Sequence, residues 1–352
     1  MDRSHLCKHA VNLGLALVFL TGCGVPPATV APTQPPPPPT AAPTLVPTAP
    51  PVPTPTATAV PAPVWVASFK GDPKPFLYPN SVAVDAQGNL YVIDAEASLV
   101  QKLDPAGKGI TQWGGHEEAF SFGFPAVDPS GRSLGGNFKA SCLAIDAAGN
   151  VYVSDSGNHR IQKFDGDGKF LTGWGSAGEG DGQFSNAICV GVDGKGYVYV
   201  ADTYNHRVQK FDANGKFIRT WGSKGVKAGQ FQEPWKPVGD AEGNVYVVDM
   251  FNSRFQKFDP DGNFLAKFDI PPVAGRLVMP LSLAQDGQGG FYVLEGDRVL
   301  KLDSRGVVVT MWGSEGSDEG QFLSTGMIAV DAQGYIYVAD SSNGRIQKFR
   351  QP

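Results

Sequence analysis

Two histidines stand in surroundings that could support chemistry. His159 and His206 are each the middle residue of an Asn-His-Arg triplet, four residues after Asp155 and Asp202. Imidazole nitrogens bind zinc and act as general bases beside carboxylates, so this pattern could supply a metal site or a catalytic triad. A third histidine in the same part of the chain is found only at His116, and a repeated Asp-x-x-Asn-His pattern creates triad-like groupings by repetition alone. We therefore interpret these residues first as parts of a repeated structural phrase.

A second suggestive segment, 165–168, reads Asp-Gly-Asp-Gly and resembles the beginning of a calcium-binding loop. The later oxygen ligands and the glutamate at position twelve of an EF-hand loop are missing. The equivalent segment of the next copy, 212–215, reads Asp-Ala-Asn-Gly. We interpret both segments as turns and predict no bound metal or cofactor.

Two cysteines, Cys142 and Cys189, occupy the same position in successive copies of the phrase, four residues before an aspartate. Small buried apolar side chains are the interpretation that we favour. A disulfide would suit an exported protein, but it needs Cα atoms within about 7 Å, and we expect neighbouring inner strands to lie farther apart. A metal site formed by the two thiols is the interpretation that we favour least, because the sequence shows no histidine or carboxylate partners for it.

The phrase itself sets the architecture. It reads YVSDSGNHRIQKFD over 152–165 and YVADTYNHRVQKFD over 199–212. A period this regular indicates one supersecondary unit stacked on copies of itself. Successive acidic positions lie 61, 47, 47, 46 and 45 residues apart, and the first spacing is long because of an insertion over 115–137. These positions are Asp94, Asp155, Asp202, Asp249, Glu295 and Asp340.

Each copy contains four short apolar runs separated by turn signals, as expected for four antiparallel strands. In the third copy the runs are 189–192, 197–201, 207–211 and 216–221. Asp-x-x-Gly follows the first run and the third run, and glycine there supplies the left-handed conformation of a tight hairpin.

The ends of the chain predict a closed ring. The sixth copy stops at 349–350 and lacks its fourth strand, whereas 65–69 (WVASF) aligns with the fourth strand of an earlier copy, 170–174 (FLTGW). The start of the repeat region would therefore complete the last unit and leave no open edge. We predict an all-β protein, a six-bladed β-propeller of four-stranded antiparallel blades whose last blade is closed by the N-terminal strand.

The phrase over 149–164, together with Gly-Gln-Phe at 182–184, 229–231 and 320–322, resembles NHL repeats, and this resemblance covers 64–352. It implies a propeller, but little about function, since NHL-type propellers include lyases, RNA binders and sensor domains. NHL-like amidating lyases take metal-binding histidines partly from the starts of inner strands. The resemblance does not support that activity, because no histidine is present at the corresponding positions of this chain. These positions are 80–81, 141–142, 188–189, 235–236, 281–282 and 326–327.

Residues common to all blades are expected to be structural. The Asp/Arg pairs, such as 202/207, should clamp the second hairpin, and the Trp-Gly-Ser runs should pack between blades. The Asp-x-x-Gly turns gather at one end of the ring, the turn face, and the second junctions and blade-to-blade connections gather at the other, the variable face. We predict that a partner binds the variable face. Its candidate residues are Phe120, Phe122, Phe124, His159, Tyr204, His206, Trp235, Lys236, Met250 and Phe251. Simple packing of several of these side chains under the loops is the alternative.

The N-terminal residues differ from the rest. An uncharged run over 10–20 is too short to span a bilayer and suits a signal peptide, and Leu-Thr-Gly-Cys at 20–23 resembles the lipobox of bacterial lipoproteins. The resemblance implies cleavage after residue 22 and a diacylglycerol on Cys23; ordinary secretion is the alternative. The Pro/Thr-rich, uncharged segment that follows should be a disordered stalk. The predicted units are therefore a signal peptide (1–22), a lipidated linker (23–63) and the propeller (64–352).

The leading functional hypothesis is a lipid-anchored, extracytoplasmic binding or scaffold module for a protein, a peptide or an envelope polymer. The alternative is a lyase or hydrolase with calcium or zinc in the central channel; we favour a protein that is not an enzyme. A formal net charge of −5 offers no broad electrostatic footprint for nucleic acid, so none is expected as a partner. We expect a monomer that touches the membrane through its lipid anchor alone.

Overall fold

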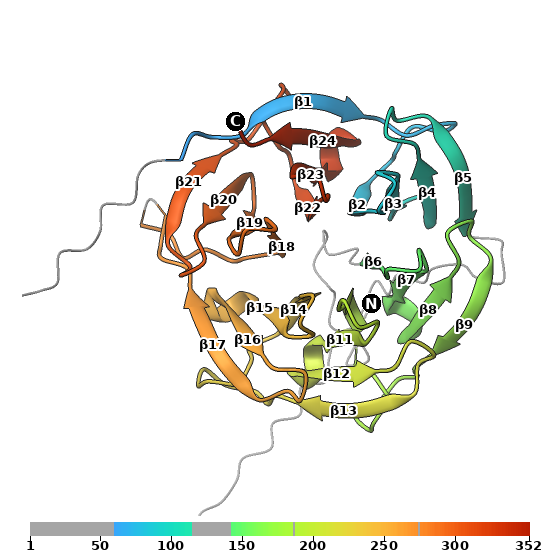
Figure 1. The fold of residues 1–352 in the computed structure, drawn as a ribbon, viewed down its shortest axis with the longest axis vertical. Coiled ribbons are helices and arrows are strands. Elements are labelled where there is room, and N and C mark those ends of the chain that lie inside the picture. Colours follow the sequence, from blue (N-terminus) through green and yellow to red (C-terminus); the bar gives the residue numbers. More distant parts are fainter. Residues whose placement is uncertain (1–59, 115–141, 186, 274) are drawn as a thin grey trace, which may run out of the picture. The chain divides into compact units, whose positions relative to one another are not determined.

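The computed structural model describes residues 60–114, 142–185, 187–273 and 275–352. Over these residues it is an all-β ring of six antiparallel sheets with four strands each (Figure 1). The predicted six-bladed propeller is thereby confirmed. Cys23, the predicted signal peptide, nearly all of the stalk, and Phe120, Phe122 and Phe124 lie outside the described residues. The described residues contain no helix of the length and apolarity that a membrane crossing requires.

We number the blades in chain order, and each runs from an innermost strand at the axis to an outermost strand at the rim. Blade 1 is β2 (Pro79–Val84), β3 (Leu90–Asp94), β4 (Leu99–Leu103) and β5 (Gly109–Gly114). Blade 2 is β6 (Leu143–Ile145), β7 (Val151–Asp155), β8 (Arg160–Phe164) and β9 (Phe170–Trp174). Blade 3 is β10 (Ala187–Val192), β11 (Val198–Asp202), β12 (Arg207–Phe211) and β13 (Phe217–Trp221).

Blade 4 is β14 (Pro234–Gly239), β15 (Val245–Asp249), β16 (Arg254–Phe258) and β17 (Phe264–Asp269). Blade 5 is β18 (Ser282–Gln285), β19 (Phe291–Glu295), β20 (Arg298–Leu302) and β21 (Val308–Trp312). Blade 6 is β22 (Thr325–Val330), β23 (Tyr335–Asp340), β24 (Arg345–Arg350) and, as its outermost strand, β1 (Val64–Phe69). Four 3-10 turns join second to third strands: η1 (Ser156–Asn158), η2 (Thr203–Asn205), η3 (Met250–Asn252) and η4 (Ser341–Asn343).

Burial explains why the repeats form strands of two kinds. Second strands such as β11 are buried along their whole length, because neighbouring blades cover both of their faces. The outermost strands alternate between more and less exposed residues, as β9 does, because only one face meets a neighbouring blade. The core is therefore a set of packed seams between blades.

Tryptophans at the rim fill these seams, as expected from the Trp-Gly-Ser runs. The ring of Trp174 in blade 2 lies 5.8 Å from that of Phe211 in blade 3, centroid to centroid. It also lies beneath Gly215, where an added Cβ would come within 2.4 Å of the indole. Gly215 has φ of +84°, so the turn requires glycine both for its backbone conformation and for room.

The second junctions are held by the predicted Asp/Arg clamp. In blade 3 the buried carboxylate of Asp202 accepts hydrogen bonds from Arg207 Nε at 2.7 Å, Asn205 at 2.9 Å and the backbone N–H of Ser185 at 2.8 Å. Arg207 in turn donates to the carbonyls of the preceding connection. Equivalent ion pairs form at 155/160, 249/254 and 340/345. The cross-strand clamp is confirmed.

One expectation about the axis was wrong. Cys142 and Cys189 form a disulfide, and their Cα atoms lie 4.8 Å apart. Inner strands converge toward the axis, so β6 and β10 come closer than we expected and fall within the range that a disulfide can span.

Candidate functional site

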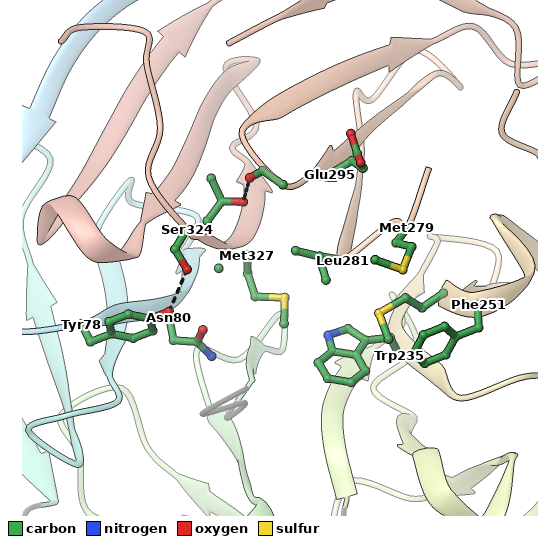
Figure 2. A pocket seen from close by; sticks show the side chains of 13 residues that line it. Tyr78, Asn80, Trp235, Phe251, Met279, Leu281, Glu295, Ser324 and Met327 are labelled. Atoms are coloured by element: carbon green, nitrogen blue, oxygen red, sulfur yellow. Dashed lines mark hydrogen bonds between the residues drawn. The ribbon is translucent and has the colours of Figure 1, made fainter. Parts of the chain in front are cut away.

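A cavity of about 410 Å³ opens on the variable face near the axis (Figure 2). Second junctions, connections and the first residues of inner strands line it, so it lies where the blades present their variable segments. The lining comprises Tyr78, Asn80, Trp235, Met250, Phe251, Met279, Leu281, Glu295, Gly296, Ser324, Thr325, Gly326 and Met327. We call this cavity the variable-face pocket.

Its walls are apolar. Trp235 of β14 and Met250 of η3 are buried, whereas Phe251 is 46% exposed and Met279 is 51% exposed at the opening. Figure 2 shows the tryptophan, the phenylalanine and Met279 on one side of the pocket, with Met327 facing them from the other. Methionine side chains are flexible and polarizable, so such walls can adapt to partners of different shape.

A few polar groups lie around the opening. The hydroxyls of Tyr78 and Ser324 form a hydrogen bond of 3.0 Å, and Thr325 donates to the carbonyl of Gly296. Glu295 supplies the one ionisable carboxylate of the lining. Burial raises its pKa, and Arg298 Nε lies 3.6 Å from its Oε2, which is too long for a hydrogen bond. The pocket thus combines apolar walls with a sparse polar rim, as ligand sites commonly do.

Blade 5 makes the pocket because it departs from the repeat. Its second junction is reduced to Gly296-Asp297 between β19 and β20, where blades 2, 3, 4 and 6 have a 3-10 turn. Its acidic position holds Glu295, which is part-exposed, in place of the fully buried aspartate of the other blades. The opening therefore occurs where one blade lacks the bulky junction of its neighbours.

The connection into blade 5 also differs. The connections into blades 3, 4 and 6 carry a Gly-Gln-Phe segment whose phenylalanine is fully buried: Phe184, Phe231 and Phe322. Residues 270–281 have no such phrase, and they present Leu277, which is 72% exposed, and Met279 to solvent. Val278 between them is buried, so alternate side chains point outward. The pocket is consequently bordered by an exposed apolar segment.

The sequence-predicted candidates divide into two groups. Trp235, Met250 and Phe251 meet in the variable-face pocket. His159 and His206 instead end 3-10 turns in the left-handed conformation, with φ of +52° and +53°. The same position holds serine at 253 and glycine at 344, so these histidines serve the turn.

His206 is further engaged by its surroundings. Its Nδ1 accepts a hydrogen bond from the backbone N–H of Glu233 at 3.3 Å, and burial lowers its pKa. Tyr204 lies in η2 and is half-buried, and its backbone N–H donates to the carbonyl of Ser185. Neither residue lines the variable-face pocket.

We predicted Lys236 on the variable face, and this prediction was wrong. Its side chain is buried at the axis, and its Nζ donates to the backbone carbonyls of Leu143 and Val190. It lines a second cavity, which opens on the turn face. Lys236 directly follows Trp235 on β14, and the two residues line different cavities.

Sequence reasoning missed several pocket residues, namely Tyr78, Met279, Leu281, Glu295 and Met327. A signal existed for one of them, since Glu295 was visible as the one glutamate among the repeat aspartates. The others lie in connections or at strand starts whose sequences follow no repeat.

Within residues 60–114, 142–185, 187–273 and 275–352, no group of three His, Cys, Asp or Glu side chains is placed to hold a metal ion. The segment 165–168 forms a hairpin turn, in which Gly168 donates to the carbonyl of Asp165.

Comparison with known proteins agrees with this architecture. The family model described as NHL repeat matches residues 76–103, 139–164, 184–211 and 328–349. Among curated proteins, the chain is similar to the E3 ubiquitin-protein ligase TRIM71 of Rattus norvegicus, with 49% identity over 45 residues. That match covers 13% of this chain and only 5% of the relative, so it concerns the repeat and not the whole protein.

Solved structures share the fold at low identity. A streptogramin B lyase has a TM-score of 0.56 and 13% identity, covering 82% of this chain and 99% of its own. A virginiamycin B lyase from Staphylococcus aureus has a TM-score of 0.53 and 11% identity, covering 81% and 98%. A protein of unknown function from Bacteroides thetaiotaomicron VPI-5482 has a TM-score of 0.56 and 18% identity, covering 84% and 73%.

At these identities the likeness establishes the fold and no activity. The repeats, in contrast, are established both by the family match and by the repeated clamps and turns that the structure displays. The NHL-repeat model thus matches four segments of this chain, and the structure is a six-bladed β-propeller.

Proposed function

We propose that this protein is a lipid-anchored, extracytoplasmic propeller that binds a protein or peptide partner at its variable face. The observation that carries the proposal is the variable-face pocket with its exposed apolar border, Phe251, Leu277 and Met279. Monomeric proteins rarely expose such side chains together unless a partner covers them. A partner's aromatic or aliphatic side chain in the pocket would act as the anchor of the interface.

The rest of the chain suits this role. NHL propellers commonly mediate protein interactions, which favours a protein or peptide over an envelope polymer. An acylated Cys23 would carry two fatty chains, enough for stable attachment to a membrane. The proline-rich linker would then let the propeller reach partners over a distance on the order of 100 Å. We propose export and anchoring on these sequence features.

A metal-dependent lyase or hydrolase is not proposed. The two lyases with a similar fold share 13% and 11% identity with this chain, which is too little to carry over an activity. The described residues also offer no set of metal ligands at the channel.

The proposal can be tested by photo-crosslinking in intact cells. A photoreactive amino acid at position 277 should capture a defined partner, identified by mass spectrometry. The double variant F251S/M279S, carrying the same crosslinker, should lose that partner, since both apolar contacts at the pocket opening are removed.

The matched control is L171S/I218S, which removes two apolar side chains of similar exposure, 45% and 40%, from the outer strands β9 and β13. It should retain the partner. If both double variants are folded and capture the partner equally well, the pocket is not the binding site.

A further inference from the structure

One position of the repeat forms a ring of side chains around the axis. In β2 and β18 this position is serine. Ser81 Oγ accepts a hydrogen bond of 3.1 Å from the backbone N–H of Leu143 in the next blade. Ser282 Oγ likewise accepts one of 3.2 Å from the backbone N–H of Ile328. In blades 2 and 3 the same position holds the disulfide. The two serines and the disulfide link inner strands of adjacent blades. The full ring comprises Ser81, Cys142, Cys189, Lys236, Ser282 and Met327.

Lys236 is the exception in this ring, because it brings a charge to the axis. Its side chain is buried, the residue being 9% exposed, and its Nζ makes only long contacts: 3.3 Å to Leu143 O, 3.4 Å to Val190 O and 4.0 Å to Cys142 Sγ. None of the carboxylates that the structure describes pairs with it. A buried ammonium normally has an anionic partner or short hydrogen bonds, and among the residues that the structure describes Lys236 has neither.

Lys236 lines a cavity of about 410 Å³ that opens on the turn face, together with Leu143, whose backbone carbonyl its Nζ contacts. Inner strands of all six blades surround it, and their aliphatic side chains include Val84, Val192 and Val238. The other charged residue of the lining is Asp331. Its carboxylate already accepts hydrogen bonds from the hydroxyl of Tyr337 and from the backbone N–H groups of 333 and 335.

We propose that this turn-face cavity binds a small aliphatic carboxylate, whose anionic group pairs with Lys236 and whose apolar body lies along the aliphatic walls. A carboxylate supplies the missing counter-ion and short hydrogen bonds for the ammonium group. The alkyl part gains by leaving water for the apolar lining. The site is separate from the variable-face pocket, so it does not depend on the proposed partner.

The experiment is calorimetric titration of the full chain, purified in a non-ionic detergent without carboxylate buffers, with three ligands of one shape. Butanoate should bind, butanamide should bind at least tenfold more weakly, and butylammonium should show no binding. Equal affinity for butanoate and butanamide, or no binding of butanoate, would overturn the proposal. Inorganic phosphate that binds as well as butanoate would also overturn it, because the site would then select a charge and not an aliphatic carboxylate.

Two variants locate the site. Lys236→Met keeps an unbranched side chain, one atom shorter, and removes the charge, so it should abolish the preference for butanoate over butanamide. Lys195→Met removes an exposed lysine from the turn face and should leave the preference intact. The variant F251S/M279S should also bind butanoate normally, so a failure at the turn face and a failure at the variable face can be told apart.

The pH dependence gives an independent readout from the wild-type protein. Burial lowers the pKa of Lys236 to about 8, so the free site loses its charge above that pH. Butanoate stays ionised throughout this range. The affinity for butanoate should therefore fall about tenfold between pH 7 and pH 9, and a flat profile would contradict the assignment.

Discussion

Trp65 of β1 lies opposite Phe349 of β24, so two residues from opposite ends of the described chain are paired in one sheet. The pairing continues to Phe69 opposite Ile346, across a bulge between Trp65 and Ala67. Residues 64–69 thus supply the fourth strand of blade 6, as Figure 1 shows at the meeting of the first and last strands. The ring is held closed by this strand, and its stability should depend on it.

The first prediction concerns the closing strand. Phe69 is buried against the turn of blade 1, where an added Cβ on Gly107 would approach its ring within 2.5 Å. Phe69→Ala should lower the free energy of unfolding by about 3 kcal/mol, as expected for a buried phenylalanine. Val66→Ser, on the exposed side of the same strand, should change it by less than about 0.5 kcal/mol. Urea unfolding measures both, and equal effects would mean that β1 is not held by its buried face.

The second prediction concerns the clamp. Asp202→Asn would leave Arg207 without its carboxylate in a buried junction, so unfolding should become easier by about 3 kcal/mol. The control is Asp261→Asn, which breaks a 3.3 Å ion pair with Arg219 between two exposed side chains. Solvent screens that pair, so its loss should be close to neutral. Thermal unfolding that ranks the two variants alike would show that the clamp is not a stabilising element.

The third prediction concerns the disulfide, which closes a loop of 47 residues. Replacing both cysteines by serine should cost about 2–4 kcal/mol, mainly because the unfolded chain regains freedom. A phosphine reductant should destabilise the wild-type protein by a similar amount and leave C142S/C189S unaffected. Mass spectrometry after alkylation should show both thiols blocked in the protein before reduction. Free thiols at both positions would contradict the bond.

The fold could be predicted from the sequence because the repeat specifies it many times over. The Asp/Arg pair seen at 202/207 recurs with the same spacing in four blades, and the Asp-x-x-Gly turns mark the first and third hairpins of the blades. The closing strand was predictable as well, since the repeat region begins with the one strand that its last copy lacks. Misreading one copy of the repeat would therefore not change the predicted fold.

The site was only partly predictable, because it depends on what does not repeat. Residues 270–281 follow no phrase, so Met279 and Leu281 could not be placed. The orientation of the Lys236 side chain could not be predicted for another reason. The register of β14 shifts between Pro234 and Pro237, and such an irregularity breaks the simple alternation of side chains. The distance between Cys142 and Cys189 depends on how closely the inner strands converge, and the sequence pattern does not predict that spacing.

The last prediction follows from the charge of Lys236 in the absence of a ligand. The residue is buried, and burial lowers its pKa from 10.5 to about 8. Between these values the unfolded chain holds a proton that the folded protein has released, so the free energy of unfolding should rise with pH. From pH 7.5 to pH 9.5 the gain attributable to Lys236 should be about 2 kcal/mol. Lys236→Met should be more stable than wild type at pH 7, and the difference should shrink as the pH rises. Chemical unfolding of both proteins across this range, in buffer free of carboxylates, measures the difference directly. A difference that stays constant with pH would mean that Lys236 titrates as it does in water, and the turn-face cavity would then hold no uncompensated charge.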